Sequence, residues 1–406
     1  MAADNELRLL SRAIRTRDIS YMLEVGLQAD WFYVDDNKTI WKFIVSHWDK
    51  YGEVPTATTV KDNFPNYRLL AVEDSIEYLT DQLIEYRKRQ KTIEVVQDAA
   101  NVLANGDHNI AVDVMAKGLA HIYDSDLRKS SEYDLSSTAL SRYDEYLEVK
   151  TRPDGLLGLP TGFKVMDVAT AGLQNGQLIT IIAPPKTGKS VLAMQVAVNI
   201  HEDGSVPMFQ SFEMTNREQQ TRHDAMRAHI SHNRLIRGKL KTAEEIKYRD
   251  SLERLQEMHK FYLTDSVTAM TVSALAAKID KVKPDVIFLD GVYLMTDEES
   301  GETNTPKALT GITRALKRLA MRIEKPIVIT TQVLEWKMRK GKVEANTIGY
   351  SSSFLQDSDV IFALERQDPE DDTTRLLKIV ASRNCGPAEV DLIWDWEHGQ
   401  FKEYGS

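Results

Sequence analysis

The sequence of 406 residues contains a single cysteine, Cys385, so no disulfide can form within one chain. It has no apolar run close to the roughly 18 residues that a membrane-spanning helix needs. Its first residues, 1–6, are acidic and lack the basic and then apolar pattern of a secretory signal peptide. Together these absences predict a cytoplasmic setting and no membrane partner.

An excess of positive charge is also missing, because the formal net charge is −10. This argues against a protein that coats nucleic acid by bulk attraction, although it leaves room for a local basic groove. A hydrophobic content of 42% and a charged content of 28% are ordinary for a globular chain, and the length predicts two or three domains.

The strongest chemical signal lies in residues 178–200. Residues 178–182 are apolar and β-branched, which predicts a buried parallel strand, and residues 191–200 have apolar positions at helical spacing. The loop between them consists of Ala183, Pro184, Pro185, Lys186, Thr187, Gly188, Lys189 and Ser190. A strand, a loop and a helix in this order are typical of a phosphate-binding loop. In such a loop backbone N–H groups face the phosphates, the lysine contacts them and the hydroxyl ligates Mg²⁺.

The match to this pattern has one blemish, since Ala183 stands where the pattern requires glycine. A chance Gly-Lys-Ser after a core strand is the alternative interpretation. The flanking strand and helix favour a nucleotide site, so we expect ATP and Mg²⁺ as cofactors.

The residues before this strand, loop and helix are different in character. Residues 1–125 have apolar residues at helical spacing, strongest at 39–51 and 74–104, and Thr56 is a candidate N-cap after a turn. They carry no catalytic constellation, which predicts a helical scaffold or oligomerisation domain. Residues 126–150 predict a linker with a short helix at 137–149, and this helix needs a partner surface such as a neighbouring subunit.

Residues 151–406 alternate strands and helices, which predicts a mainly parallel sheet flanked by helices. Further strands are predicted at 206–213, 261–264, 286–290 and 326–331, and helices at 216–231, 242–258, 272–282 and 308–323. The last strands, 360–364, 374–382 and 389–394, follow one another without helices and predict an antiparallel extension. The predicted fold class is an all-α N-terminal domain plus an α/β P-loop domain.

Three polar side chains follow strands, where an α/β sheet binds its ligands. Asp290 ends an apolar strand, as does a Walker B aspartate that positions Mg²⁺. Glu213 ends the strand after the P-loop helix, where a carboxylate can polarise the water that attacks the γ-phosphate. Gln332 ends another strand and can sense that phosphate. For Asp290 and Glu213, a structural role in a turn is the alternative.

Two arginines are further candidates. Arg222 lies on the helix after Glu213, and either contacts phosphates or is only surface charge. Arg383 follows a strand in a turn with glycine and proline. In a ring ATPase such an arginine reaches the neighbour's γ-phosphate and raises the rate by about 10³- to 10⁵-fold. A surface-loop arginine is the alternative.

Eight short motifs occur in the order and at the spacings of one known family. They lie at residues 158–163, 171–174, 183–190, 211–214, 289–290, 331–332, 356–359 and 383–384. Together they resemble the DnaB family of replicative hexameric DNA helicases, which has a RecA-like motor domain and often has alanine first in its P-loop. Residues 30–56 resemble the helical collar of that family. The short chain suggests a bacteriophage member, acting in the cytoplasm of its bacterial host.

The resemblance implies a role for each matched residue. Lys189 and Ser190 would bind phosphate and Mg²⁺, Glu213 would be the general base and Asp290 the Walker B aspartate. Gln332 would couple the sites, Arg222 would contact phosphate, and Arg383 would act in trans as an arginine finger. The implied protein is a ring, expected to be a homo-hexamer, that translocates on single-stranded DNA and unwinds duplex DNA at the replication fork. A primase and a helicase loader are its candidate partners.

Two departures from the family pattern concern the finger and the DNA loop. Relatives often have a lysine two residues before the finger, where this chain has Ala381, which leaves Lys378 as a candidate substitute. Cys385 is inserted after the finger, and Gly349 stands where many relatives have arginine. The residues that we still predict to bind DNA are Lys342, Gly349, Ser351, Ser352 and Ser353, through charge, hydroxyl and backbone N–H groups. A solvated basic loop is the alternative for residues 337–342.

Two other functions remain open at this level. A RecA-type or clock-type DNA-binding ATPase shares the motor core, although the collar-like residues 1–125 argue against it. A nucleotide-binding scaffold subunit with low turnover is favoured by the two departures at Ala381 and Gly349.

Overall fold

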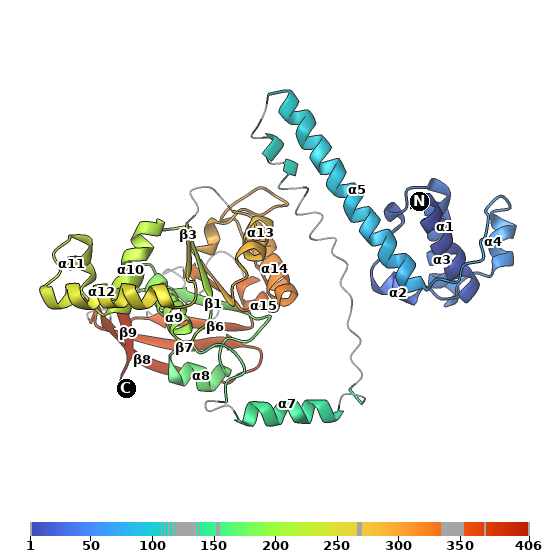
Figure 1. Cartoon of the computed structure of the whole chain (residues 1–406). Coiled ribbons are helices and arrows are strands. Elements are labelled where there is room, and N and C mark those ends of the chain that lie inside the picture. Colours follow the sequence, from blue (N-terminus) through green and yellow to red (C-terminus); the bar gives the residue numbers. More distant parts are fainter. Residues whose placement is uncertain are drawn as a thin grey trace. The chain divides into compact units, whose positions relative to one another are not determined.

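The computed structural model describes residues 2–106, 108, 110–112, 114–115, 118, 135–136, 139–151, 155–265, 270–333, 353–368 and 371–404. Two compact units divide the chain, Met1–Ser137 and Thr138–Ser406 (Figure 1). Among the described residues, no helix is both long enough and apolar enough to span a membrane.

The first unit is helical. Its elements are α1 (Ala2–Thr16), α2 (Ser20–Glu24), the 3-10 turn η1 (Ala29–Trp31), α3 (Asp35–Tyr51), α4 (Ala57–Asn63) and α5 (Ile76–Ala104). One hydrophobic cluster joins them, in which Leu10, Trp41 and Leu79 are almost fully buried. Thr56 caps α4 by accepting a hydrogen bond from the Thr59 backbone N–H at 3.1 Å, which confirms the predicted cap.

The helix α7 (Ala139–Thr151) has no buried residue. Its apolar side chains are nevertheless numerous, and Leu140, Tyr143 and Tyr146 are 81%, 58% and 56% exposed. Exposed apolar residues grouped in this way are typical of surfaces that contact another protein, as predicted for this helix.

The second unit is built on a nine-stranded sheet in the order β3-β2-β4-β5-β1-β6-β7-β8-β9. The parallel strands are β1 (Leu178–Ala183), β2 (Pro207–Ser211), β3 (Tyr262–Asp265), β4 (Val286–Asp290), β5 (Ile327–Gln332) and β6 (Val360–Glu365). The antiparallel strands are β7 (Thr374–Ser382), β8 (Glu389–Asp395) and β9 (Gln400–Glu403). The predicted antiparallel extension is confirmed, and β9 is a strand that the sequence pattern did not predict.

Helices cover both faces of this sheet (Figure 1). On one face α8 (Lys164–Thr170) and α9 (Lys189–Glu202) pack against alternate strand residues such as Ile179 and Ile181. On the other, α13 (Val272–Val282) and α14 (Pro306–Ile323) pack against Leu178 and Ile182. The alternation follows from the two-residue period of a strand, and burial on both faces explains why β1 is apolar throughout.

The remaining helices of the second unit are α10 (Asn216–Ala228), α11 (His232–Ile236), α12 (Thr242–Glu257), α15 (Ser353–Asp357) and the 3-10 turn η2 (Val292–Leu294). Predicted and observed helices agree within a few residues for α10, α12, α13 and α14. The short helices α8, α11 and α15 were not predicted, because pieces of five to seven residues give too little periodicity to recognise.

Candidate nucleotide-binding site

The loop between β1 and α9 is shaped by its glycine. Gly188 has φ of 108°, a conformation that L side chains rarely adopt, and it stands directly before the first residue of α9. A Cβ added there would lie 2.7 Å from ring atoms of Trp394 and of Phe401. The chain therefore turns tightly into the helix, and the free N–H groups of the first helical turn are suited to bind an anion.

Lys189 and Ser190 extend from the first turn of α9 to the ends of neighbouring strands. The Lys189 ammonium, 8% exposed, donates to Glu213 Oε1 at 2.9 Å and to Thr330 Oγ1 at 3.1 Å, and lies 3.5 Å from Asp290 Oδ1. The Ser190 hydroxyl donates to Asp290 Oδ1 at 3.0 Å. A hydroxyl and a carboxylate oxygen thus face one point, and hard oxygen donors of this kind suit Mg²⁺.

Asp290 is held in place from a second side. The side chain, 1% exposed, accepts a hydrogen bond from Thr330 Oγ1 at 2.7 Å, and Thr330 in turn accepts from the Gly291 backbone N–H at 2.9 Å. Thr330 therefore connects the end of β4 with β5 and orients the carboxylate toward α9.

Glu213 belongs to a chain of polar contacts at the same edge. It accepts a hydrogen bond from Tyr293 Oη at 2.7 Å, and Tyr293 accepts one from Gln332 Nε2 at 2.8 Å. A Cβ on Gly291 would come within 2.9 Å of the Glu213 side chain, so a glycine is needed there. The structure thus links Gln332 to Glu213 through a tyrosine.

Arg222 lies on α10, within electrostatic reach of this cluster. Burial lowers the pKa of Arg222, while the carboxylates of Asp290, Glu218 and Glu213 act in the opposite direction. An arginine keeps its charge under such a shift. It therefore adds a second cation, besides Lys189, near the carboxylates at this end of the strands.

Arg383 lies at the opposite end of the strands from the P-loop. The end of β7 pairs with the start of β6, which pairs with the start of β1, whereas the P-loop follows the end of β1. Arg383 is 53% exposed, and its Nη2 donates to the Gln356 carbonyl at 2.6 Å. Arg383 and the P-loop of the same chain therefore lie at opposite ends of the parallel strands.

Lys378 does not lie beside Arg383. Its ammonium forms an ion pair with Glu365 Oε1 at 2.8 Å, and it pairs with Ala363 on β6, whereas Ala381 pairs with Ile361. The ion pair and the register separate Lys378 from Arg383. The structure therefore does not support Lys378 as a replacement for the lysine that is missing at position 381.

The sequence patterns did not single out three residues that orient this site. Thr330 contacts Asp290, Tyr293 contacts Glu213, and the buried Arg375 contacts the P-loop at Thr187. Only the position of Thr330 before the strand-end Thr331-Gln332 offered a signal.

Of the residues predicted to bind DNA, Lys342, Gly349, Ser351 and Ser352 lie outside the described residues. Ser353 opens α15 and is 2% exposed. DNA contact by these residues stays a prediction.

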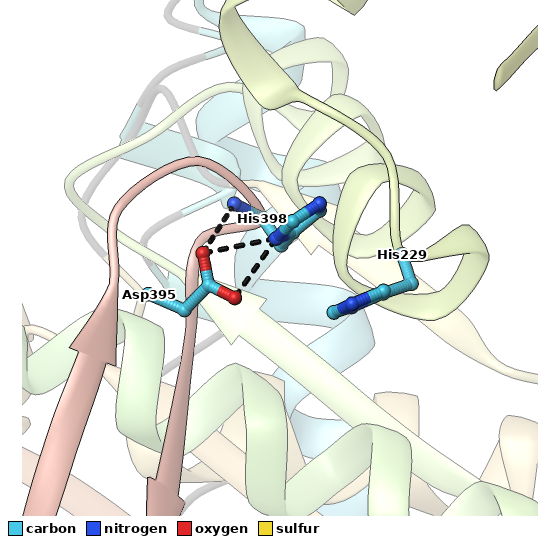
Figure 2. A group of neighbouring side chains, drawn as sticks. All are labelled: His229, Asp395 and His398. Carbon is cyan, nitrogen blue, oxygen red and sulfur yellow. Dashed lines mark hydrogen bonds and ion pairs between the residues drawn. The ribbon is translucent and has the colours of Figure 1, made fainter.

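A separate cluster joins His229 at the end of α10 to Asp395 and His398 in the turn between β8 and β9 (Figure 2). Its residue types suit a metal ion. However, Asp395 already accepts hydrogen bonds from His398 Nδ1 at 2.8 Å and from the Lys402 ammonium at 3.0 Å, and Gln400 is bonded to His229. The two imidazole rings stack with centroids 3.9 Å apart. The carboxylate is already neutralised by a lysine, so we interpret the cluster as a structural contact that attaches the β8–β9 turn to the end of α10.

A phosphate loop after β1, a strand-end aspartate that meets the loop serine and a largely parallel sheet define a P-loop NTPase of RecA-like architecture. Residues 158–403 match the family model described as DnaB-like helicase C terminal domain. Since this match covers more than half of the chain, the chain belongs to the DnaB-like helicase family.

Individual relatives are similar to this chain over more than the residues 158–403 that match the family model. The chain is 25% identical over 403 residues to "Replicative DNA helicase DnaC" of Bacillus subtilis (strain 168), with 92% of this chain and 88% of that protein covered. It is 26% identical over 282 residues to "Replicative DNA helicase DnaB" of Geobacillus stearothermophilus, with 66% of this chain and 61% of that protein covered. Among solved structures, a DnaB-like replicative helicase described with its interactions with primase has a TM-score of 0.67 at 18% identity, covering 98% of both chains. At this identity the solved structure supports the fold.

Proposed function

We propose that this chain is an ATP-dependent replicative DNA helicase that forms a ring, moves along single-stranded DNA and separates duplex DNA at a replication fork. One observation carries the proposal. The residues that would bind and hydrolyse ATP lie at one edge of the sheet, while Arg383 lies exposed at the other edge. A site of this kind is completed by the next subunit, as in a ring of identical chains.

Each site residue then has a defined task. The P-loop N–H groups and Lys189 would bind the phosphates of ATP, and Ser190 and Asp290 would hold Mg²⁺, which would bridge the phosphate oxygens. Glu213 would accept a proton from the attacking water, with Tyr293 fixing the orientation of its carboxylate. Gln332, at the end of that hydrogen-bond chain, would report the state of the γ-phosphate to the residues predicted to bind DNA, which follow β5 in the sequence.

Assembly would use the exposed apolar residues of α7. Leu140, Tyr143 and Tyr146 offer an apolar face without a partner surface on the described part of α7's own chain, and a second copy of the chain would cover it. We propose a hexamer. The helical first unit would form a collar, and a primase and a helicase loader are the proposed partners. The relative whose structure is described with primase supports the first of these.

The proposal is tested by ATP turnover of the full chain with and without single-stranded DNA. We expect DNA to stimulate the wild type. Glu213→Gln should lower turnover by at least about 10²-fold, since a general base contributes that much or more. The matched control is Glu257→Gln, an exposed glutamate at the end of α12, which should leave turnover unchanged. Turnover that ignores DNA in the wild type would contradict a motor and favour a scaffold.

A further inference from the structure

The strand β7 runs from the end of the parallel strands that carries the P-loop to their opposite end. It is antiparallel to β6, and β6 is parallel to β1, so β7 begins at the edge that carries the P-loop and ends at the opposite edge. At about 3.3 Å per residue, the backbone from Arg375 to Arg383 spans about 26 Å. One arginine therefore lies near each end of a single strand.

Arg375 is fully buried, with 0% exposure, beneath the P-loop. Its Nε donates to the Thr187 carbonyl at 3.1 Å, its Nη1 to the Thr374 carbonyl at 2.7 Å and its Nη2 to Asp372 Oδ1 at 2.9 Å. Its guanidinium lies 4.5 Å from the centroid of the Trp394 ring. Burying a charged group is costly even when it is paired, so this arrangement points to a role besides stability.

The contact with Thr187 orients one peptide of the P-loop. In a planar trans peptide the C=O of Thr187 and the N–H of Gly188 point in opposite directions. Since Arg375 holds this carbonyl, the N–H of Gly188 faces away from Arg375, on the side of the loop where such groups bind phosphate. Trp394 and Phe401 also pack closely against Gly188, because an added Cβ there would lie 2.7 Å from ring atoms of both residues.

The far end of β7 is also attached to the sheet. The Arg383 backbone N–H donates to the Asp359 carbonyl at 3.0 Å, and its Nε lies 3.7 Å from Asp359 Oδ1. Asp359 in turn accepts from the Leu178 backbone N–H at 2.8 Å, at the first residue of β1. Both ends of β7 are thus connected to β1, one through Asp359 and one through the P-loop.

We propose that β7 is a two-ended positioning strand: Arg375 sets the chain's own P-loop, and through β7 it sets Arg383, which serves the nucleotide of the neighbouring subunit. The proposal rests on the proposed function, because it requires a finger that acts between subunits. When the P-loop closes on phosphate, the Thr187–Gly188 peptide and its carbonyl move together, and Arg375 moves with them. Arg375 is a positioning residue, whereas Arg383 would touch the reacting phosphate.

The test uses mixed rings of full-length chains at saturating ATP and single-stranded DNA. Subunits with Arg383→Ala keep an intact site but lack the finger, and subunits with Glu213→Ala lack the base but donate a finger. The decisive donor carries Glu213→Ala and Arg375→Met. Its matched control carries Glu213→Ala and Arg366→Met, because Arg366 pairs with the same Asp372 at 3.2 Å but has an exposed side chain.

We expect the Glu213→Ala donor and the Arg366 control donor to restore turnover to Arg383→Ala subunits. The Arg375→Met donor should restore at least about 10-fold less, since misplacing a catalytic group by about 1 Å costs up to about 10²-fold. Equal rescue by that donor would overturn the proposal, because the active subunits have an intact Arg375. If the simple Glu213→Ala donor rescues nothing, the shared site itself is refuted, and the two failures are distinguishable.

A second measurement covers the case in which Arg375→Met prevents assembly. Arg375→Lys keeps a buried cation but cannot make the same three-directional contact. In the wild type a non-hydrolysable ATP analogue should slow amide hydrogen exchange at residues 382–385, at the far end of β7 from Arg375. In Arg375→Lys the analogue should have no effect there. The same slowing in both proteins would overturn the proposal.

Discussion

Replacing Gly188 by alanine tests how tightly the P-loop is packed. The residue has φ of 108°, and its Cβ would lie 2.7 Å from ring atoms of Trp394 and Phe401. A strained backbone of this kind costs about 1–3 kcal/mol, and overpacking a well-packed site costs a further ~1–3 kcal/mol. The expected loss in the free energy of unfolding is therefore about 2–6 kcal/mol.

The control for Gly188→Ala is Gly238→Ala. Gly238 also has a positive φ, 62°, but nothing lies within 4 Å of an added Cβ. Its cost is limited to the backbone term, about 1–2 kcal/mol. For a domain of this size 1 kcal/mol shifts Tm by about 2–4 °C, so Gly188→Ala should lower Tm by at least about 4 °C and Gly238→Ala by less. Differential scanning calorimetry measures both, and a fluorescent ATP analogue measures affinity.

Affinity separates the two glycines more sharply than stability does. Gly188→Ala should weaken binding of the analogue by at least about 10-fold, whereas Gly238→Ala should leave it unchanged. Adding Phe401→Leu to Gly188→Ala should recover part of the lost stability, with a coupling of at least about 0.5 kcal/mol. Equal melting temperatures and equal affinities for the two alanine variants would refute the account of a loop held from below.

Three further predictions follow from the structure. Thr330→Val should cost about 1–3 kcal/mol of unfolding free energy and lower turnover, because Asp290 and a backbone N–H lose their partner; Thr330→Ser should restore both, and a valine variant with wild-type stability and turnover would contradict the bridge. Burial lowers the pKa of His201 below its ordinary 6.5, so the unfolded chain binds more protons and stability should fall as pH drops from 7 through 6.5; His201→Gln should flatten this fall in thermal melts, and an unchanged slope would contradict it. Tyr143→Asp on α7 should reduce the mass measured by light scattering, whereas Tyr404→Asp, also exposed, should not; intact rings in the first variant would refute assembly through α7.

Much of the fold follows from the sequence because each element carries a local signal. The apolar strand before Gly188 and the strands that contain Asp290 and Ser382 were located within a residue or two. Periodicity and strand-end chemistry suffice for this, since they depend only on neighbouring residues. The same signals placed Lys189, Glu213 and Asp290 at one edge of the sheet, and the structure brings these three side chains together.

The contacts that orient the site could not be predicted, because they depend on the register between strands. Thr330 meets Asp290 only because β5 lies beside β4, and its position before Thr331 and Gln332 does not reveal this partner. Tyr293 meets Glu213 across 80 residues of chain. Nothing in the sequence of the predicted antiparallel strand indicates that Arg375 is buried, and its partner Thr187 lies 188 residues away.

The most direct test of the central claim is strand separation on a forked DNA duplex whose unpaired arms give a ring access to one strand. Fluorescence of a quenched end label follows the wild type and Lys189→Ala, each with ATP and with a non-hydrolysable analogue. We predict that only the wild type with ATP releases the labelled strand, and that a fully paired duplex without arms is not opened. If the wild type hydrolyses ATP in response to single-stranded DNA but never separates the fork, the protein is a DNA-dependent ATPase of another kind and the helicase proposal is contradicted.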